Sequence, residues 1–572
     1  MKYIRKFKKG ILVAGVAIVL VLSAGFMVSS DRDFEILKNL DIYFSLFREL
    51  NLFYVDDTNP EKLVTKSIDA MLSSLDPYTQ YIPESEADDF RFQTTGEYGG
   101  IGAIIRRGTD AVVIAEPYEN SPAARSGLKA GDLLTEINGK PVKDQAITDV
   151  SEMLKGAPGT QIELTVKRPY ENKTFKKTIT REQIVIPNVP YYGIVAKGIG
   201  YIRLSSFTPN AGKEVGDALK DMKKNMNVHS VILDLRGNPG GLLVEAVNVV
   251  SNFVDKGQEV VSTRGKVQQF DNVYRTTDNP VDSVIPLVVL VNRSSASASE
   301  IVTGAIQDLD RGVIVGQRTF GKGLVQTTRR LSYNAQLKVT TAKYYIPSGR
   351  CIQALDYSHR NPDGSVGYIP DSLIRAFKTK KGRVVYDGGG IQPDIHVETD
   401  LLSNLAVSLY TKNLIFDYAT DYAAHHDTVL AANKFRITDE MYRQFTQFLQ
   451  GKDFDYETES EAKLDDLIKL AKREKYYATA APEFTALKQK LAHDKNKDLQ
   501  IFKPEIEDLL GEEIMSRYYY QKGRIEFSLQ TDEQFSKAIQ VLQDPQLYNS
   551  ILNGSWKEKT TETRAYDMQN AD

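Results

Sequence analysis

The chain has very little of several residue types on which structural and catalytic sites often depend. Cys351 is the only cysteine among the 572 residues, which excludes an intramolecular disulfide and a cysteine-rich zinc site. The six histidines include no HExxH zinc motif and no recognisable catalytic triad motif. We therefore expect neither a metal nor a cofactor, and a hydrolytic serine in this chain would need a base other than histidine.

The chain also has no excess of charge of either sign. It contains 72 lysines and arginines against 75 aspartates and glutamates, which gives a formal net charge of -3. Nucleic-acid binding usually requires a basic face, so this balance gives no case for a nucleic-acid partner. At roughly 100–200 residues per domain, the length predicts three or four folded units.

A cluster of basic residues at the N-terminus precedes an uncharged apolar run from Gly10 to about Val28. The run is close to the roughly 20 residues that cross a bilayer core, and longer than the about 7–15 apolar residues of a cleaved signal peptide. We expect residues 1–30 to be a signal anchor, because the exit sequence Phe-Met-Val-Ser-Ser is a poor cleavage site. A cleaved signal is the alternative, and both export the rest of the chain. No cysteine lies directly after the run, which excludes a lipoprotein.

The rest of the chain divides by its hydrophobic pattern. Residues 31–94 have helical spacing, and residues 95–182 contain short β-type runs broken by turn signals. Strands and helices alternate over residues 183–400, which predicts a layered α/β domain. Within it, residues 351–387 are polar and resemble an inserted loop. Residues 401–572 return to helical periodicity with few strand signals, so we expect a C-terminal helical region.

One strand-to-helix junction carries the most chemical information. A buried apolar strand stops at Asn292, small residues follow, and a helix begins. A serine at such a junction can lie beside unpaired helix amides that bind a developing oxyanion. Local chemistry leaves several serines of residues 294–299 as candidates, and simple helix capping is the alternative. Lys322, between two glycines, is a candidate base, although an exposed loop lysine is the default interpretation.

Seven short motifs occur in one order over roughly residues 75–395: LDPYTQYIP, SPAARSGLKAGD, ILDLRGNPGGLL, VNRSSASASEI, GQRTFGKGLVQ, YYIPSGRCIQ and GIQPDI. In this set the chain resembles the C-terminal processing peptidases, also called tail-specific proteases. The resemblance implies a crotonase- or Clp-like layered α/β serine protease core that follows a PDZ domain. Two departures are a cysteine at position 351, where relatives more often have serine, and the long polar stretch after it.

The resemblance also implies roles for individual residues. The nucleophile is the middle serine of SASAS, Ser297, and the general base is Lys322, 25 residues further on. Gln326 matches the residue that positions the lysine, and its amide can do so without adding charge. The oxyanion hole uses the backbone amide of Ala298 and a glycine amide of RGNPGG, for which we favour Gly240 over its neighbour.

Residues 95–182 resemble a PDZ domain, on the strength of YGGIGAII and the downstream SPAARSGLKAGDLLTEING. Gly100, Ile101, Gly102 and Ala103 are the expected binding loop, where successive amides capture a peptide C-terminal carboxylate and the next strand pairs with the peptide. In the family this module engages substrate tails and gates the protease. Whether it activates or inhibits here is left open.

Together these features predict a serine endopeptidase that cleaves exported proteins at or near their C-termini. We expect it in the cell envelope, anchored in the inner membrane with its catalytic part in the periplasm. Terminal helices in related enzymes suggest a homodimer, with helices that only cap the core as the alternative; an adaptor is not identified. A catalytically dead PDZ scaffold and a crotonase-type acyl-handling enzyme are the competing functions. Competent residues at all three catalytic positions argue against the first, and the PDZ module argues against the second.

Overall fold

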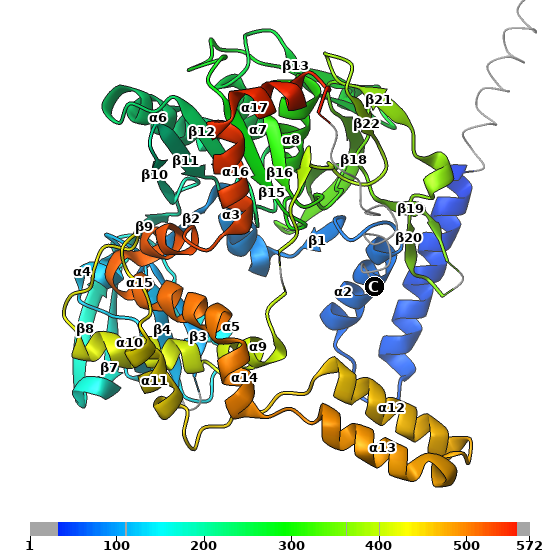
Figure 1. The fold of residues 1–572 in the computed structure, drawn as a ribbon. Coiled ribbons are helices and arrows are strands. Elements are labelled where there is room, and N and C mark those ends of the chain that lie inside the picture. The colour runs from blue at the N-terminus through cyan, green and yellow to red at the C-terminus, as the bar shows by residue number, and fades with distance from the viewer. Residues whose placement is uncertain (1–31, 109–110, 362, 400, 557–572) are drawn as a thin grey trace, which may run out of the picture. The chain divides into compact units, whose positions relative to one another are not determined.

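A computed structural model describes residues 32–108, 111–361, 363–399 and 401–556 (Figure 1). The anchor expected at residues 1–30 lies outside these ranges. Among the described residues, no helix combines the length and apolar character needed to cross a bilayer. The chain forms two compact units, Met1–Tyr81 and Ile82–Asp572.

The described part of the first unit is helical, as expected. Residues 32–53 form one helix, and α2 (Pro60–Ser73) follows after a short break. α2 starts where the sequence provides a cap and a compatible first residue: the Asn59 side chain accepts a hydrogen bond from the Lys62 amide, and Pro60 lies at the first helical position. Large apolar side chains on the 32–53 helix, Phe34, Leu37 and Phe44 among them, are exposed.

In the second unit, residues 97–185 form a small β-domain. Its main sheet has the order β3-β4-β5-β7-β8, with β6 paired to β5, and β2 pairs separately with β9. Alternate residues of β7 are buried, which places one face of the sheet on the core. A tight hairpin turn joins β5 to β6, and both of its residues, Asn138 and Gly139, have positive φ. The elements are β2 (Glu97–Gly100), β3 (Ala103–Arg107), β4 (Val112–Pro117), α4 (Pro122–Arg125), β5 (Leu133–Ile137), β6 (Lys140–Pro141), α5 (Ile147–Leu154), β7 (Gln161–Arg168), β8 (Lys173–Thr180) and β9 (Glu182–Val185).

A six-stranded sheet forms the centre of the expected layered α/β domain. Its order is β10-β11-β12-β15-β16-β23, and every pair after the first is parallel. Because both faces are covered, β12 and β15 are buried along their whole length. Helices α6, α7 and α8 supply the core on one face. The elements are β10 (Tyr191–Ala196), β11 (Ile199–Arg203), α6 (Ala211–Asn225), β12 (Ser230–Asp234), α7 (Leu243–Ser251), β15 (Leu287–Val291), α8 (Ala298–Asp308), β16 (Val313–Gly316) and β23 (Ile395–His396).

A second, antiparallel sheet contains β13 (Glu259–Gly265), β14 (Asn272–Arg275), β17 (Leu324–Arg330) and β18 (Gln336–Tyr345). The polar stretch 351–387 is more than an inserted loop. It forms two short hairpins, β19 (Leu355–Arg360) with β20 (Val366–Tyr368) and β21 (Ala376–Lys378) with β22 (Val384–Tyr386). Their strands are short and largely exposed, which explains why their sequence has no clear strand pattern.

The C-terminal region is helical over its described residues, and its helices divide into three groups. Helices α9, α10, α11, α14 and α15 contribute to a core of their own, whereas α16 and α17 pack on the second face of the six-stranded sheet. Helices α12 and α13 pack against each other and contribute no residue to either core. The bounds are α9 (Asn404–Thr411), α10 (Leu414–His425), α11 (Asp439–Phe448), α12 (Glu459–Arg473), α13 (Tyr477–Leu491), α14 (Lys495–Ile501), α15 (Lys503–Ser528), α16 (Glu533–Gln543) and α17 (Pro545–Leu552).

Candidate active site

The candidate catalytic residues lie on three loops at one edge of the six-stranded sheet. Gly240 follows β12, Ser297 follows β15 and Lys322 follows β16. These three strands are adjacent and parallel, so their carboxyl ends meet at the same edge. Open α/β sheets bind their ligands outside this edge. The structure thus brings together segments that are far apart in the sequence.

Ser297 differs from the serines on either side of it. Its backbone has φ 55° and ψ −112°, a strained positive-φ conformation for a residue with a side chain, directly before α8. The Ser295 and Ser299 side chains are fully buried, and their hydroxyls donate to the carbonyl oxygens of Leu235 and Asn238 at 2.9 Å. Ser297 is half-buried. Of these three serines, only Ser297 has the exposure and the sharp turn expected of a nucleophile.

Lys322 is half-buried in a loop that leaves no room for side chains on either side of it. A Cβ on Gly321, which has φ +88°, would lie 2.4 Å from the Ala354 Cβ. A Cβ on Gly323 would lie 2.8 Å from the Gln353 nitrogen. The two glycines therefore let the loop pack closely against the segment that follows β18, which argues against an unrestrained surface lysine.

Glu300 connects the two loops, and the sequence analysis missed it. Its Oε2 accepts hydrogen bonds from the backbone N–H of Ser297 at 2.8 Å and of Lys322 at 2.9 Å. Its Oε1 accepts from the Thr319 hydroxyl and from the Gly321 N–H, both at 2.6 Å. Burial raises the pKa of Glu300 to about 7, and these four hydrogen bonds oppose the rise. A signal was present, because Ser297-x-x-Glu300 matches the capping-box pattern.

Gln326 lies on β17, four residues beyond Lys322. Its Nε2 donates to the Thr340 hydroxyl on β18 at 3.1 Å, and a bulge separates it from Val325 in the strand register. Cys351 is partly buried, and burial raises the pKa of its thiol, as suits a packing residue.

The two expected oxyanion donors belong to backbone segments in close contact. A Cβ built on Gly240, where φ is +102°, would lie 2.8 Å from the Ala298 nitrogen and 2.8 Å from the Ser297 Cβ. Asn238 fixes this contact, since its carbonyl oxygen accepts from the Ala296 N–H at 3.1 Å. The Gly240 N–H itself donates to the Asn238 Oδ1 at 2.9 Å, so an oxyanion would have to share or replace that acceptor. The oxyanion role of Gly240 stays a prediction.

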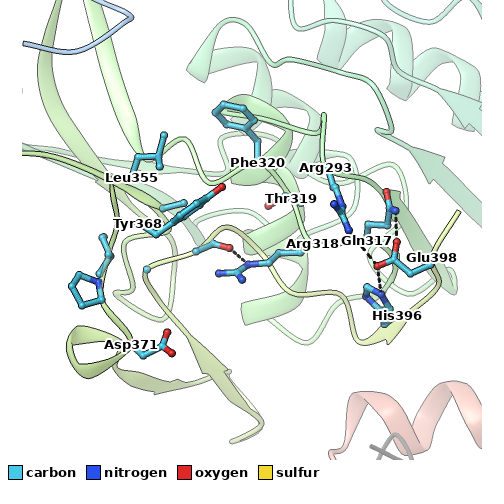
Figure 2. Close-up of a pocket in the computed structure, with 15 residues that line it drawn as sticks. Arg293, Gln317, Arg318, Thr319, Phe320, Leu355, Tyr368, Asp371, His396 and Glu398 are labelled. Atoms are coloured by element: carbon cyan, nitrogen blue, oxygen red, sulfur yellow. Dashed lines mark hydrogen bonds and ion pairs between the residues drawn. The ribbon is translucent and has the colours of Figure 1, made fainter. Parts of the chain in front are cut away.

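A pocket of about 530 Å³ adjoins the Lys322 loop, because Thr319 and Phe320 line it. Figure 2 shows Glu398 on one side, joined to Arg293, Gln317 and His396 at 3.5, 2.6 and 2.8 Å. The hairpin of residues 355–371 supplies the other side, with Leu355, Tyr368, Ile369 and Pro370. The Phe320 N–H donates to the Ser295 carbonyl at 3.1 Å, which connects this pocket to the loop that carries Ser297. Its apolar side suits an apolar peptide side chain.

The predicted peptide-binding loop lies between β2 and β3, and β3 is at the end of its sheet, where a peptide strand can add. The carbonyls of Ile101 and Gly102 accept hydrogen bonds from the amides of Ala123 and Tyr118 at 2.8 and 2.9 Å. Gly102 has φ +75°, and a Cβ there would meet the Ser121 Cβ at 2.5 Å. These contacts tie the loop to residues 118–123.

The C-terminal helices contact this β-domain through charged and polar groups. Arg524 pairs with Glu116 at 3.4 Å, and Lys522 pairs with Glu119 at 3.0 Å. The Tyr170 hydroxyl also donates to the Asp417 carbonyl at 3.1 Å.

A strained serine turn at the edge of a layered α/β core, next to a peptide-binding β-domain, defines a PDZ-containing serine peptidase. The profile of peptidase family S41 matches residues 198–366, that of the PDZ domain matches residues 113–168, and that of a probable PDZ-protease C-terminal helical domain matches residues 405–542. The chain belongs to peptidase family S41.

Similar proteins are found among curated sequences and solved structures. A carboxy-terminal-processing protease of Bartonella bacilliformis is 36% identical over 371 residues, 64% of this chain and 81% of that protein. A probable CtpA-like serine protease of Staphylococcus aureus is 32% identical over 426 residues, 72% of this chain and 82% of that protein. The structure of a photosystem II D1 C-terminal processing protease is 28% identical, with a TM-score of 0.34; the match covers 63% of this chain and 93% of that one.

Gly240→Ala tests the contact between the β12 loop and the nucleophile turn. The new Cβ would push Ser297 and Ala298 from their positions, and a displacement of about 1 Å can cost roughly 100-fold in rate, so we expect kcat to fall by about that factor. Gly257→Ala is the matched control, because Gly257 also has positive φ but has nothing within 4 Å of its Cβ position. Steady-state kinetics on folded variants would contradict the expectation if Gly240→Ala kept kcat within about threefold of the parent.

Proposed function

We propose that this chain is a Ser/Lys endopeptidase in which Ser297 attacks the peptide carbonyl and Lys322 removes its proton. Gln326 positions the lysine, and the amides of Ala298 and Gly240 stabilise the oxyanion. One observation carries the proposal. The strained Ser297 turn and the Lys322 loop lie at the same edge of the sheet, where the backbone N–H of each residue donates to one carboxylate oxygen of Glu300. A neutral lysine amine is a competent base for a serine hydroxyl, and no histidine is needed.

Ser297→Ala and Lys322→Ala are each expected to abolish cleavage of an unfolded protein substrate, with losses of at least about 1000-fold, because nucleophile and base act as a unit. Both side chains are partly exposed, so the melting temperatures should change little. Ser294→Ala and Lys256→Ala alter exposed residues of the same types and should keep full activity.

Full activity in either catalytic variant would overturn the dyad. A fluorophosphonate probe that fails to label Ser297, with and without peptide, would instead favour an inactive PDZ scaffold. Turnover of an acyl thioester without any peptide cleavage would favour an acyl-handling enzyme.

We also propose that substrates are exported proteins cut at or near their C-termini, and that the PDZ domain engages their tails and gates the protease. The edge position of β3 and the rigid loop at Gly100, Ile101, Gly102 and Ala103 support this proposal. The contacts between this domain and the C-terminal helices offer a physical route for gating.

A substrate with a free C-terminal carboxylate should therefore be cleaved with a kcat/KM at least about tenfold above that of its C-terminal amide, since hydrogen bonds to a charged group contribute roughly 1.5–3 kcal/mol. Calorimetric binding of both peptides to the Ser297→Ala variant separates recognition from catalysis. Equal affinity and equal kcat/KM for the carboxylate and the amide substrate would contradict recognition of the C-terminal carboxylate.

For location and assembly, we propose an envelope enzyme held at the inner membrane by the N-terminal apolar segment, with its catalytic part in the periplasm, and a homodimer formed through terminal helices. The exposed apolar side chains of the 32–53 helix support the second point. Extraction of the full chain from membranes by alkaline carbonate would contradict the anchor, and a monomer mass by light scattering would contradict the dimer.

A further inference from the structure

The loop that carries Gly240 is connected to the C-terminal helices through the side chain of Arg236. Arg236 is the second residue after β12, and its guanidinium is largely buried. It pairs with Asp234, the last residue of β12, and with Asp532, the N-cap of α16, each at 2.6 Å. It also donates to the Oε1 of Gln534, in the first turn of α16, at 3.2 Å. Arg236 therefore bridges the end of β12 and the start of α16.

The backbone between Arg236 and the candidate nucleophile is short and closely packed. The Arg236 N–H donates to the Asp234 Oδ1 at 2.9 Å. Asn238 is fully buried two residues further on, and its Oδ1 accepts from the Gly240 N–H at 2.9 Å. A Cβ on Gly240 would lie 2.8 Å from the Ser297 Cβ, so the loop has little free space where it meets the nucleophile turn. A displacement of Arg236 would therefore be transmitted toward Ser297.

Asp532 supplies the second negative charge of this cluster. Arg203 and Arg236 both pair with Asp234, at 2.8 and 2.6 Å, so two cations share one fully buried carboxylate. The carboxylate of Asp532 balances the remaining positive charge. Without it, the largely buried Arg236 would keep an unmatched charge, which favours movement of its guanidinium toward water.

The two oxygens of Asp532 have different partners. The Oδ1 accepts from the Phe535 N–H at 2.9 Å and caps α16, whereas the Oδ2 pairs with Arg236. Helix stability explains only the first contact, because a cation beside a helix N-terminus is unfavourable for the helix. An asparagine could keep the cap through its Oδ1, but it would turn an NH₂ group toward the guanidinium.

The same turn of α16 also contacts the segment after β23. The Gln534 side chain is fully buried, and its Nε2 donates to the Val397 carbonyl at 2.8 Å. Val397 directly follows β23, and its N–H donates to the Gly316 carbonyl at the end of β16 at 2.9 Å. Because β12, β15, β16 and β23 are parallel, the first turn of α16 lies at the sheet edge that carries the candidate site.

We propose that the first turn of α16 is a positioning element for catalysis. Asp532, assisted by Gln534, holds Arg236 and thereby keeps the Gly240 loop against Ser297. Both side chains act through Arg236 and not on the substrate. The inference deepens the proposed Ser/Lys function and rests on it, and it makes the C-terminal helical region necessary for full activity.

The test compares Asp532→Asn with the parent, both as full chains, in steady-state cleavage of an unfolded protein substrate. We expect kcat to fall about tenfold, and at least fivefold, with KM changed less than threefold, because the alignment of reacting groups is lost. Labelling of Ser297 by a fluorophosphonate separates alignment from folding. The fraction of molecules labelled at completion should equal that of the parent, whereas the rate constant of labelling should fall at least fivefold.

Asp544→Asn is the matched control, because Asp544 is the N-cap of the next helix, α17. Asp544 is exposed, and its Oδ1 accepts from the Gln546 and Leu547 N–H groups, both at 3.0 Å. Its replacement should leave kcat and the rate constant of labelling within twofold of the parent. A merely structural role for Asp532 would instead give incomplete labelling with the rate constant of the parent.

If Asp532→Asn does not fold, Arg236→Lys replaces it. The charge is kept, but an ammonium lacks the planar fork that contacts Asp234 and Asp532 together, and the same loss in kcat is expected. A folded variant that keeps kcat within fivefold of the parent, loses activity only through KM, or is labelled with the rate constant of the parent overturns the proposal. Failure of the Ser297→Ala and Lys322→Ala tests would instead overturn the underlying dyad, so the two failures are distinguishable.

Discussion

The candidate site depends on one backbone constraint: Ser297, which carries a Cβ, is held at a positive φ of 55°. Such a conformation costs about 1–3 kcal/mol and persists only where neighbouring groups enforce it. At Ser297 these groups act on both sides of the residue: its N–H is held by Glu300, and its carbonyl accepts from the Tyr344 hydroxyl at 3.2 Å. Gly240 is the third element, because its lack of a Cβ leaves room for the turn. The strain is therefore maintained by residues from β18, α8 and the β12 loop.

Hydrogen bonds between successive loops hold the three loops at this edge of the six-stranded sheet together. Asn238 joins the β12 loop to the Ser297 loop through its carbonyl, which accepts from the Ala296 amide and the Ser299 hydroxyl. Glu300 then joins the Ser297 loop to the Lys322 loop. Because parallel strands place these loops side by side, one backbone carbonyl and one side chain suffice for the two links. A site built in this way is organised before substrate arrives, which is what electrostatic stabilisation of a transition state requires.

The parts of this arrangement that the sequence predicted are those with strong local signals. The apolar run that stops at Asn292 located β15, and the alternation of strand and helix patterns over residues 183–400 located the layered α/β domain. Ser297 was chosen among its neighbours only through family resemblance, whereas the structure separates them physically, since Ser295 and Ser299 are buried and hydrogen-bonded.

Other features depend on tertiary contacts that the sequence does not encode locally. The hairpins of residues 355–386 have short, exposed strands, so their polar composition suggested a loop. Glu300 lay within a readable capping-box pattern, but its link to Lys322 joins positions 22 residues apart, and local spacing cannot show such a contact. Amphipathic periodicity likewise shows that α16 has an apolar face without showing which surface that face covers.

Through the surface that they cover, α16 and α17 connect the C-terminal region to the candidate active site. Phe535, Val541 and Ile551 are buried against the sheet face opposite α8, and each contributes roughly 1.5–3 kcal/mol on burial. An ion-pair network continues this contact into the site. Burial would raise the pKa of Asp234, at the end of β12, but Arg203 and Arg236 hold it well below its usual range, and Arg236 also pairs with Asp532, the N-cap of α16, at 2.6 Å. Because Arg236 begins the loop that carries Gly240, α16 helps to fix a segment that contacts Ser297, the proposed nucleophile. The C-terminal region in this sense supports the candidate active site, and is not only an appendage that could serve assembly.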